Sequence, residues 1–166
     1  MDLFSETLSM LEDTSCDFNH FFYRLGNTPI FNFTSTADFK TGAEHILPAD
    51  TEITKRTSIE KLAHWLEKQY KPRLEKERST DDMERKERMG RVNPKFILKQ
   101  WVLEEVIKNT KSEKGVGVKN KEMLEMVLRM TLEPFREEWG GDRGEEERFC
   151  GDVPKIERGF QCSCSS

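Results

Sequence analysis

The apolar residues of this chain recur every three or four positions, which is the spacing of one face of an α-helix. The clearest example is the segment 17–26, where Asp17 can cap the first turn and Gly26 can end the last one. A similar spacing precedes it in residues 3–11. We therefore expect a mainly α protein whose residues 1–26 form a helical hairpin. The residues that share the clearest face are Phe18, Phe21, Phe22 and Leu25.

The helical spacing is lost in residues 27–56, which are rich in Pro, Gly, Thr, Asn and Asp. This composition predicts a long loop or an insertion. Residues 57–133 regain the spacing and are expected to form a helical core, in which Pro72 kinks or divides the first helix. The central helix should run from Asn93 to about 109, because Asn93 followed by Pro is a strong start signal.

A last helix is expected near residues 121–132, before Pro134. From there the segment 134–166 is acidic and Gly-rich without any period, so we expect an irregular tail that ends in Cys-Ser-Ser. Trp101 of the central helix should be the best buried tryptophan, and Trp139 should lie at the surface. The residues of the last helix that should face inward are Met123, Leu124, Val127 and Leu128.

The composition predicts a thin core and excludes several kinds of partner. Charged residues make up 35% of the chain, against about 25% in typical domains. The 27 Lys and Arg are mixed with 31 Asp and Glu, for a net charge of −4, which disfavours a nucleic-acid partner. No apolar run approaches the roughly 20 residues needed to cross a bilayer, so no membrane partner is expected.

Few groups in the sequence are arranged for catalysis. Gly115-Val116-Gly117 lacks the third glycine of a dinucleotide-binding loop, so a turn between helices is the simpler interpretation. The acidic pair at 81–82 and the acidic triplet at 145–147 are expected to be solvated. No catalytic, cofactor-binding or metal-binding residue is predicted. The three histidines have no spacing suited to zinc and are His20, His45 and His64.

Two cysteines near the chain end, Cys162 and Cys164, are expected to be exposed and chemically available. Prenylation is excluded because Ser163, not a cysteine, stands fourth from the end. A zinc site would use Cys150 with these two thiols and would lack a fourth ligand. Thiol redox chemistry or an inert tail remains. The redox candidates are Cys164, Cys162 and Cys150.

Five short segments, taken in order, carry a resemblance to a known family. They are SCDFNHFF at 15–22, WLEK at 65–68, RMGRVNPKFIL at 88–98, LEPF at 132–135 and the terminal CSS at 164–166. Together they resemble the C-terminal part of the selenoprotein O family. The resemblance also places Cys164 at the family's third-from-last position, which holds selenocysteine in some members and cysteine in others. Under oxidation we therefore expect Cys164 to pair with Cys150, or with a second chain.

The resemblance implies a protein-kinase-like fold that binds ATP inverted and passes AMP to Ser, Thr or Tyr hydroxyls of protein substrates. The family uses ATP and Mg²⁺, and its nucleotide, metal and catalytic residues lie upstream of the part that this chain resembles. The chain is thus expected to be a helical C-terminal extension that packs on a kinase-like N-terminal domain and is inactive, without cofactors, when alone. A mitochondrial location is expected on the same basis, although no targeting segment is expected in this chain, and a cytoplasmic location is the alternative. The alternative function is that of a free-standing helical module that binds a protein partner.

Overall fold

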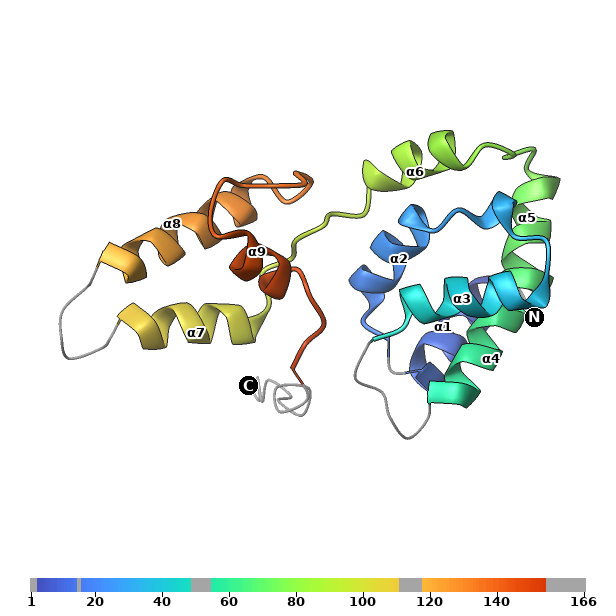
Figure 1. The fold of residues 1–166 in the computed structure, drawn as a ribbon, viewed down its shortest axis with the longest axis horizontal. Helices are drawn as coiled ribbons and strands as arrows, with labels where there is room; N and C mark the ends of the chain where they lie inside the picture. Colours follow the sequence, from blue (N-terminus) through green and yellow to red (C-terminus); the bar gives the residue numbers. More distant parts are fainter. Residues whose placement is uncertain (1–2, 15, 49–54, 111–117, 155–166) are drawn as a thin grey trace. The chain divides into compact units, whose positions relative to one another are not determined.

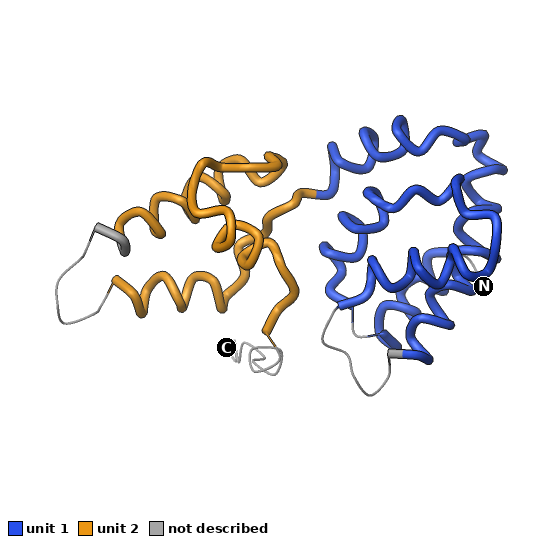
Figure 2. The backbone as a smooth tube through the Cα atoms, in the orientation of Figure 1, with its two compact units in different colours: residues 1–93 blue, residues 94–166 orange. Residues whose placement is uncertain are grey.

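The computed structural model describes residues 3–14, 16–48, 55–110 and 118–154 (Figure 1). These residues form helices and connecting turns, with no strand among them. The prediction of a mainly α protein is therefore confirmed. The chain divides into two compact units, residues 1–93 and 94–166, which are described separately (Figure 2).

Unit 1 contains the longer series of helices. Within it, α3 packs along α4, α2 packs against α3 and α6, and α1 packs against α4. The two helices predicted in residues 1–26 are present, although each packs mainly on other helices. The elements are α1 (Leu3–Thr14), α2 (Phe18–Asn27), η1 (Ile30–Asn32), α3 (Thr36–Ile46), α4 (Lys55–Trp65), η2 (Leu66–Tyr70), α5 (Lys71–Lys76) and α6 (Asp82–Gly90).

The core of unit 1 is built on the face that the spacing in α2 predicted. Phe21 and Leu25 are buried there, and the Phe21 ring meets the edge of Trp65 with centroids 5.8 Å apart. Leu62 and Leu66 complete the contact from the neighbouring helix. Phe18, at the first position of α2, is more than half exposed.

The prediction of one long loop over residues 27–56 is wrong in its described part, which holds η1 and α3. Ser35 caps α3 by accepting a hydrogen bond from the Asp38 amide, and the Asp38 carboxylate accepts one from the Ser35 amide in return. The polar composition reflects the exposed face of α3. Gly42, which weakens the helical signal, is required because a Cβ there would collide with the Phe33 ring.

Pro72 was predicted to kink or divide the long helix, but the structure has a change of helix type before it and no break. The chain passes from α4 through η2, a turn of π-helix, directly into α5 without leaving the helical path. Pro72 has no amide hydrogen for the carbonyl four residues back, and a wider π turn just before it accommodates the missing bond. The helix begins at Lys55, ahead of the start near Thr57 that the sequence suggested.

Unit 2 has a helical hairpin, α7 (Gln100–Thr110) and α8 (Val118–Leu132), and a shorter helix, α9 (Arg143–Phe149). The predicted helix start at Asn93 is wrong. The Asn93 side-chain amide instead donates to the Met89 carbonyl at the end of α6, and the Phe96 amide donates to the Pro134 carbonyl at 3.1 Å. This long-range bond keeps the residues just before α7 in an extended conformation. The helix therefore begins only at Gln100.

The segment 134–166 is not irregular throughout, because its described part contains α9 and a buried tryptophan. Asp142 caps α9 by accepting from the Glu145 amide at 3.0 Å. Trp139 is only 4% exposed, against 7% for Trp101 and 5% for Trp65, so the predicted order of burial is wrong. The Trp139 indole donates to the Glu133 carbonyl at 2.8 Å, a contact that no local period reveals.

The helix predicted near residues 121–132 is present as α8, but its buried face is rotated from the predicted one. Val127 faces the core as expected, whereas Leu124 and Leu128 are about half exposed. Met126 and Met130 take their place in the core. The reason is that the segment before α9 packs on the Met126 side of α8, which draws the buried face toward it.

We expect the two units to unfold separately, since their hydrophobic cores share no side chain. Trp139→Ala should remove hydrogen-exchange protection from α7 and α8 while α2 and α4 keep theirs. Leu62→Ala, at a fully buried site in unit 1, is the matched variant and should have the opposite pattern. Mass spectrometry of exchanging peptides measures both. Joint loss of protection in both units from either change would contradict the prediction.

Candidate functional site

Cys150 is the redox candidate that lies among the described residues. It follows α9, is half buried, and packs against the core of unit 2. Burial raises the pKa of its thiol to about 11, an effect that nearby Lys95 only partly offsets. The thiolate is the reactive form of cysteine. Cys150 is therefore a weak nucleophile at neutral pH.

We expect Cys150 in the native chain to react with iodoacetamide at pH 7.5 about a hundredfold more slowly than in the urea-unfolded chain, given the difference in pKa. At a pH between the unfolded and the folded pKa, the folded thiol is protonated and the unfolded thiol is not. Stability should therefore fall as the pH rises from about 9 to about 11. Peptide mass spectrometry gives the rates. Equal rates in native and unfolded chains would contradict this.

The other predicted redox residues, Cys162 and Cys164, lie outside the described residues, as do Gly115 to Gly117. Cys16, the remaining cysteine, is half buried against the core of unit 1. The redox assignment of the terminal cysteines thus stays a prediction.

Arg85 of α6 joins that helix to the end of α2, and its role was not evident from the sequence. Its side chain is only 1% exposed. One terminal nitrogen donates to the Leu25 carbonyl at 2.9 Å, the other donates to the Thr28 carbonyl, and Nε donates to Asp82 at 3.1 Å. Arg85 thereby satisfies carbonyls at the end of α2. Burial raises the pKa of the neighbouring Tyr70, while the charge of Arg85 acts against that rise.

Of the pair Asp81 and Asp82, Asp81 is exposed as expected, whereas Asp82 is half buried and contacts another segment. Asp82 accepts hydrogen bonds from the amides of Ile30 and Phe31, at 3.1 and 2.9 Å, and forms the ion pair with Arg85. Asp81 caps α6 by accepting from the amide of Met83. Both carboxylates are therefore structural, and Asp82 holds η1 against α6.

Glu146 also departs from the expectation for the run 145–147. It is 5% exposed, and its carboxylate accepts from the Gly141 amide at 2.7 Å and from the Trp139 amide at 3.2 Å. The neighbours Glu145 and Glu147 remain on the surface. Glu146 thus fastens the turn that positions Trp139, and it is unavailable for acid–base work.

No metal site is evident in residues 3–14, 16–48, 55–110 and 118–154: no group of three or more His, Cys, Asp or Glu side chains there is placed to hold an ion. His20 is buried, whereas His45 and His64 are exposed. The described residues therefore do not fit the Mg²⁺ that the resemblance implies for the family. Within that same part of the chain, no helix has the length and apolar character to cross a membrane.

Among the described residues, a groove in each unit is large enough to receive a ligand. The groove of unit 1, of about 470 Å³, lies between α1 and α4 over Met10 and Trp65. The groove of unit 2, of about 630 Å³, lies between α8 and the segment 140–145. Its carboxylates include Glu125, which pairs with Lys121, and Glu145, which pairs with Arg148. The groove is also lined by Glu122, Asp142 and Arg129, so carboxylates outnumber cationic groups in its lining.

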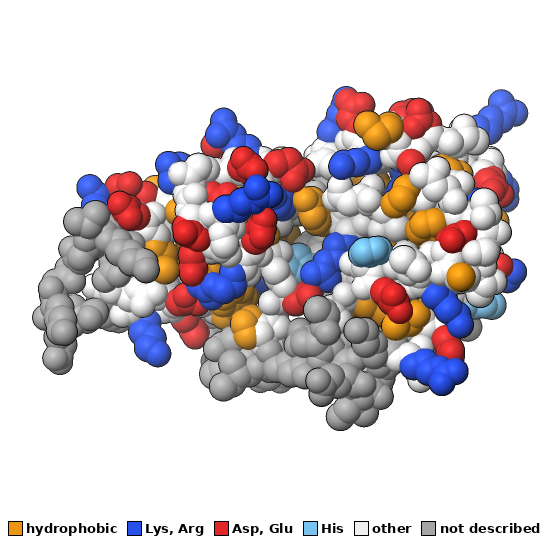
Figure 3. Space-filling view, viewed as in Figure 1, with side chains coloured by type: hydrophobic (Ala, Val, Ile, Leu, Met, Phe, Trp, Pro, Cys, Tyr) orange, Lys and Arg blue, Asp and Glu red, His pale blue; other side chains and the backbone are white. Residues whose placement is uncertain are grey.

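The surface of unit 2 also carries an uncovered apolar face on its helical hairpin, although Figure 3 shows acidic and basic side chains mixed on the face of the unit in view. We call it the leucine face. Its members are between 40% and 71% exposed, which is unusual for side chains on paired helices. They are Leu103 and Ile107 of α7 and Leu124, Leu128 and Leu132 of α8.

Comparisons with known proteins agree on one family. The family model described as protein adenylyltransferase SelO matches residues 1–128, which includes three of the five segments that carry the resemblance. The chain is 30% identical over 171 residues to "Protein adenylyltransferase SelO, mitochondrial" of Schizosaccharomyces pombe. It is 28% identical over 165 residues to "Protein nucleotidyltransferase YdiU" of Myxococcus xanthus.

Each of these alignments covers 99% of this chain but 28% of the relative. The chain thus spans less than a third of the length of the curated relatives it matches. No solved structure matches it. Because the family model covers most of the sequence and the relatives align along nearly all of it, the chain belongs to the SelO family of nucleotidyltransferases.

Proposed function

We propose that this chain is the C-terminal helical part of a longer protein adenylyltransferase, which passes AMP from ATP to hydroxyl groups of protein substrates. The observation that carries the proposal is the coverage: two relatives named as nucleotide-transferring enzymes align along 99% of this chain but only 28% of their own length. The name of the Schizosaccharomyces pombe relative also supports a mitochondrial location.

We assign this chain a supporting role in that reaction rather than the nucleotide site. Transfer from ATP requires metal ions and cationic groups arranged around the triphosphate. The described residues bring together no set of metal ligands, and the sequence has no Gly-x-x-x-x-Gly-Lys-Ser/Thr loop. The ATP and Mg²⁺ ligands would then belong to the part of the relatives that this chain does not match, the expected kinase-like domain.

A chimera tests the proposal. In it, this chain replaces the matching part of the Schizosaccharomyces pombe relative, and ATP labelled at the α-phosphate reports AMP transfer to protein. We expect the chimera to transfer AMP, and the isolated chain and the relative lacking its matching part to transfer none. A folded but inactive chimera, or transfer by the isolated chain, would overturn the proposal.

For the cysteines we propose a redox pair. A peroxide would oxidise Cys164 to a sulfenic acid with release of water, and the Cys150 thiol would then displace a second water to form the disulfide. The raised pKa makes the Cys150 thiol a poor first target for the peroxide, and it also makes the attack of Cys150 on the sulfenic acid slow at neutral pH. After peroxide treatment we expect a Cys150 to Cys164 link or a link between chains. Preferential oxidation of Cys150 in the variant Cys164→Ser, at an undiminished rate, would contradict the order.

The second candidate function is a free-standing helical module that binds a protein partner, and the exposed leucine face favours it. The two functions predict different coding sequences upstream of this chain in the gene. A coding sequence for the nucleotide-binding part directly upstream supports the adenylyltransferase, whereas an unrelated upstream sequence supports the module.

A further inference from the structure

On both helices of the hairpin in unit 2, the residue directly before a core residue faces α9 or the segment just before it. Trp101 directly precedes the core residue Val102, and its ring lies 5.7 Å from that of Phe149 on α9. Met126 directly precedes the core residue Val127, and it packs against Gly141 just before α9. One residue corresponds to a rotation of about 100° around a helix. The positions one residue before the core therefore face the α9 side on both helices.

The leucine face occupies the positions on the other side. Leu103 and Ile107 directly follow Val102 and Val106, and Leu128 directly follows Val127. These residues are turned about 100° in the opposite sense. Because α7 and α8 run antiparallel, equal rotations bring both sets to the same side of the pair. The leucine face is thus one continuous surface opposite α9.

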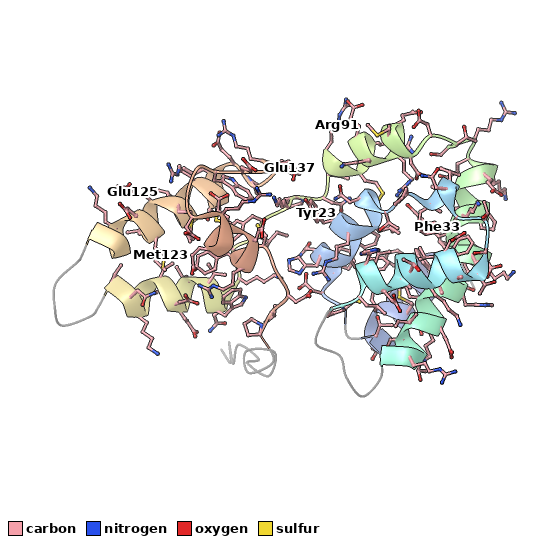
Figure 4. The ribbon with its side chains drawn as sticks, viewed as in Figure 1. Tyr23, Phe33, Arg91, Met123, Glu125 and Glu137 are labelled. Atoms are coloured by element: carbon pink, nitrogen blue, oxygen red, sulfur yellow. The ribbon has the colours of Figure 1, made fainter. Side chains whose placement is uncertain are left out.

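Two charged residues near this surface, Glu104 and Glu125, each have a partner on their own helix. Lys121 pairs with Glu125 at 3.6 Å, and Gln100 donates to Glu104 at 2.6 Å. Figure 4 shows Glu125 pointing away from α7, whereas Met123 lies toward it. The five members of the leucine face are themselves uncharged. The surface therefore fits an apolar partner.

The size of the surface indicates how the partner is attached. Separate chains that associate stably use roughly 20–30 residues a side, and the leucine face has five apolar members. A partner in the same polypeptide needs less area, because the connecting chain supplies an effective concentration near the millimolar range. The curated relatives contain additional chain of more than twice this length, since only 28% of each is matched.

We propose that the leucine face docks on an apolar surface of the part of the longer protein that this chain does not match, and that it is not a contact between two copies. The inference rests on the proposed function for the existence of that part. The family match, which ends at residue 128, includes four of the five members of the face.

The test uses the same chimera and the isolated chain, each with Leu124→Glu combined with Leu128→Glu. Met83→Glu is the control for one of the two added charges, because Met83 is an exposed apolar residue of unit 1. Hydrogen exchange in residues 121–132 should be at least about tenfold slower in the chimera than in the isolated chain. The double variant should abolish this difference and leave the melting temperature of the isolated chain unchanged. Met83→Glu should change neither quantity.

Equal exchange of residues 121–132 in the chimera and the isolated chain would overturn the docking proposal, as would a stable dimer of the isolated chain that the double variant dissociates. AMP transfer is a separate readout. An active chimera without protection removes the docking proposal alone, and a protected chimera without AMP transfer removes the proposed function alone.

Discussion

Replacing Arg85 by alanine is expected to destabilise unit 1 by about 3–5 kcal/mol, the usual cost of removing one partner from a buried charged network. The change removes the Arg85 hydrogen bonds to the carbonyls of Leu25 and Thr28, of which the Leu25 carbonyl keeps the Thr28 amide as a donor, and it leaves Asp82 without its cation. Arg85→Lys should recover only part of the loss, because an ammonium group cannot reach three acceptors in the planar arrangement of a guanidinium.

Urea unfolding followed by hydrogen exchange of α2 and α6 measures this effect. The control is Arg91→Ala near the end of the same helix, where the side chain is exposed and pairs with the exposed Glu87 (Figure 4). An exposed pair contributes about 0.2–1 kcal/mol. Equal midpoints for Arg85→Ala and Arg91→Ala would show that the Arg85 network does not stabilise unit 1.

Trp139→Ala should cost about 3–5 kcal/mol in unit 2, the range for large buried aromatic side chains. The indole packs edge-on to Phe96 with centroids 6.2 Å apart, and Lys95 lies over the ring at 5.7 Å. Its loss would leave a cavity and would also leave the Glu133 carbonyl without the indole hydrogen bond. The loss should appear as a lower urea midpoint for unit 2, read by the exchange of α7 and α8.

The matched control is Phe135→Ala, four residues before Trp139. Phe135 is an aromatic residue of the same segment, but it is more than half exposed. Its removal should cost less than about 1 kcal/mol, as is usual at exposed sites. A midpoint change for Trp139→Ala no larger than that for Phe135→Ala would contradict the observed burial of the indole.

The spacing of apolar residues was enough to locate α2, α4 and α8, because each of these helices has one face that differs in polarity from the rest. It failed for α3, where Gly42 and a polar outer face conceal the buried Phe39, Ala43 and Ile46. It also misplaced the start of α7, since the Asn93-Pro94 signal is overridden by the bond between Phe96 and Pro134.

For the candidate sites, the sequence indicated the family and the cysteines but not which groups would be buried. Asp82 and Glu146 looked like members of solvated charge runs, because the residues beside them in the chain are polar. In the fold each accepts backbone hydrogen bonds that no exposed carboxylate would need. Likewise, the raised pKa of Cys150 follows from its packing and has no counterpart in its local sequence.

The sequence by itself thus determined the helical class, the mixed charge, the membership of a family and the faces of the most regular helices. These properties depend on residues within one or two helical turns of each other. The tertiary structure alone decided the burial of Trp139, the role of Arg85 and the uncovered leucine face. Arg85 binds the carbonyl of Leu25, 60 positions away in the chain. Such contacts depend on how distant helices meet, and a local period contains no information about that meeting.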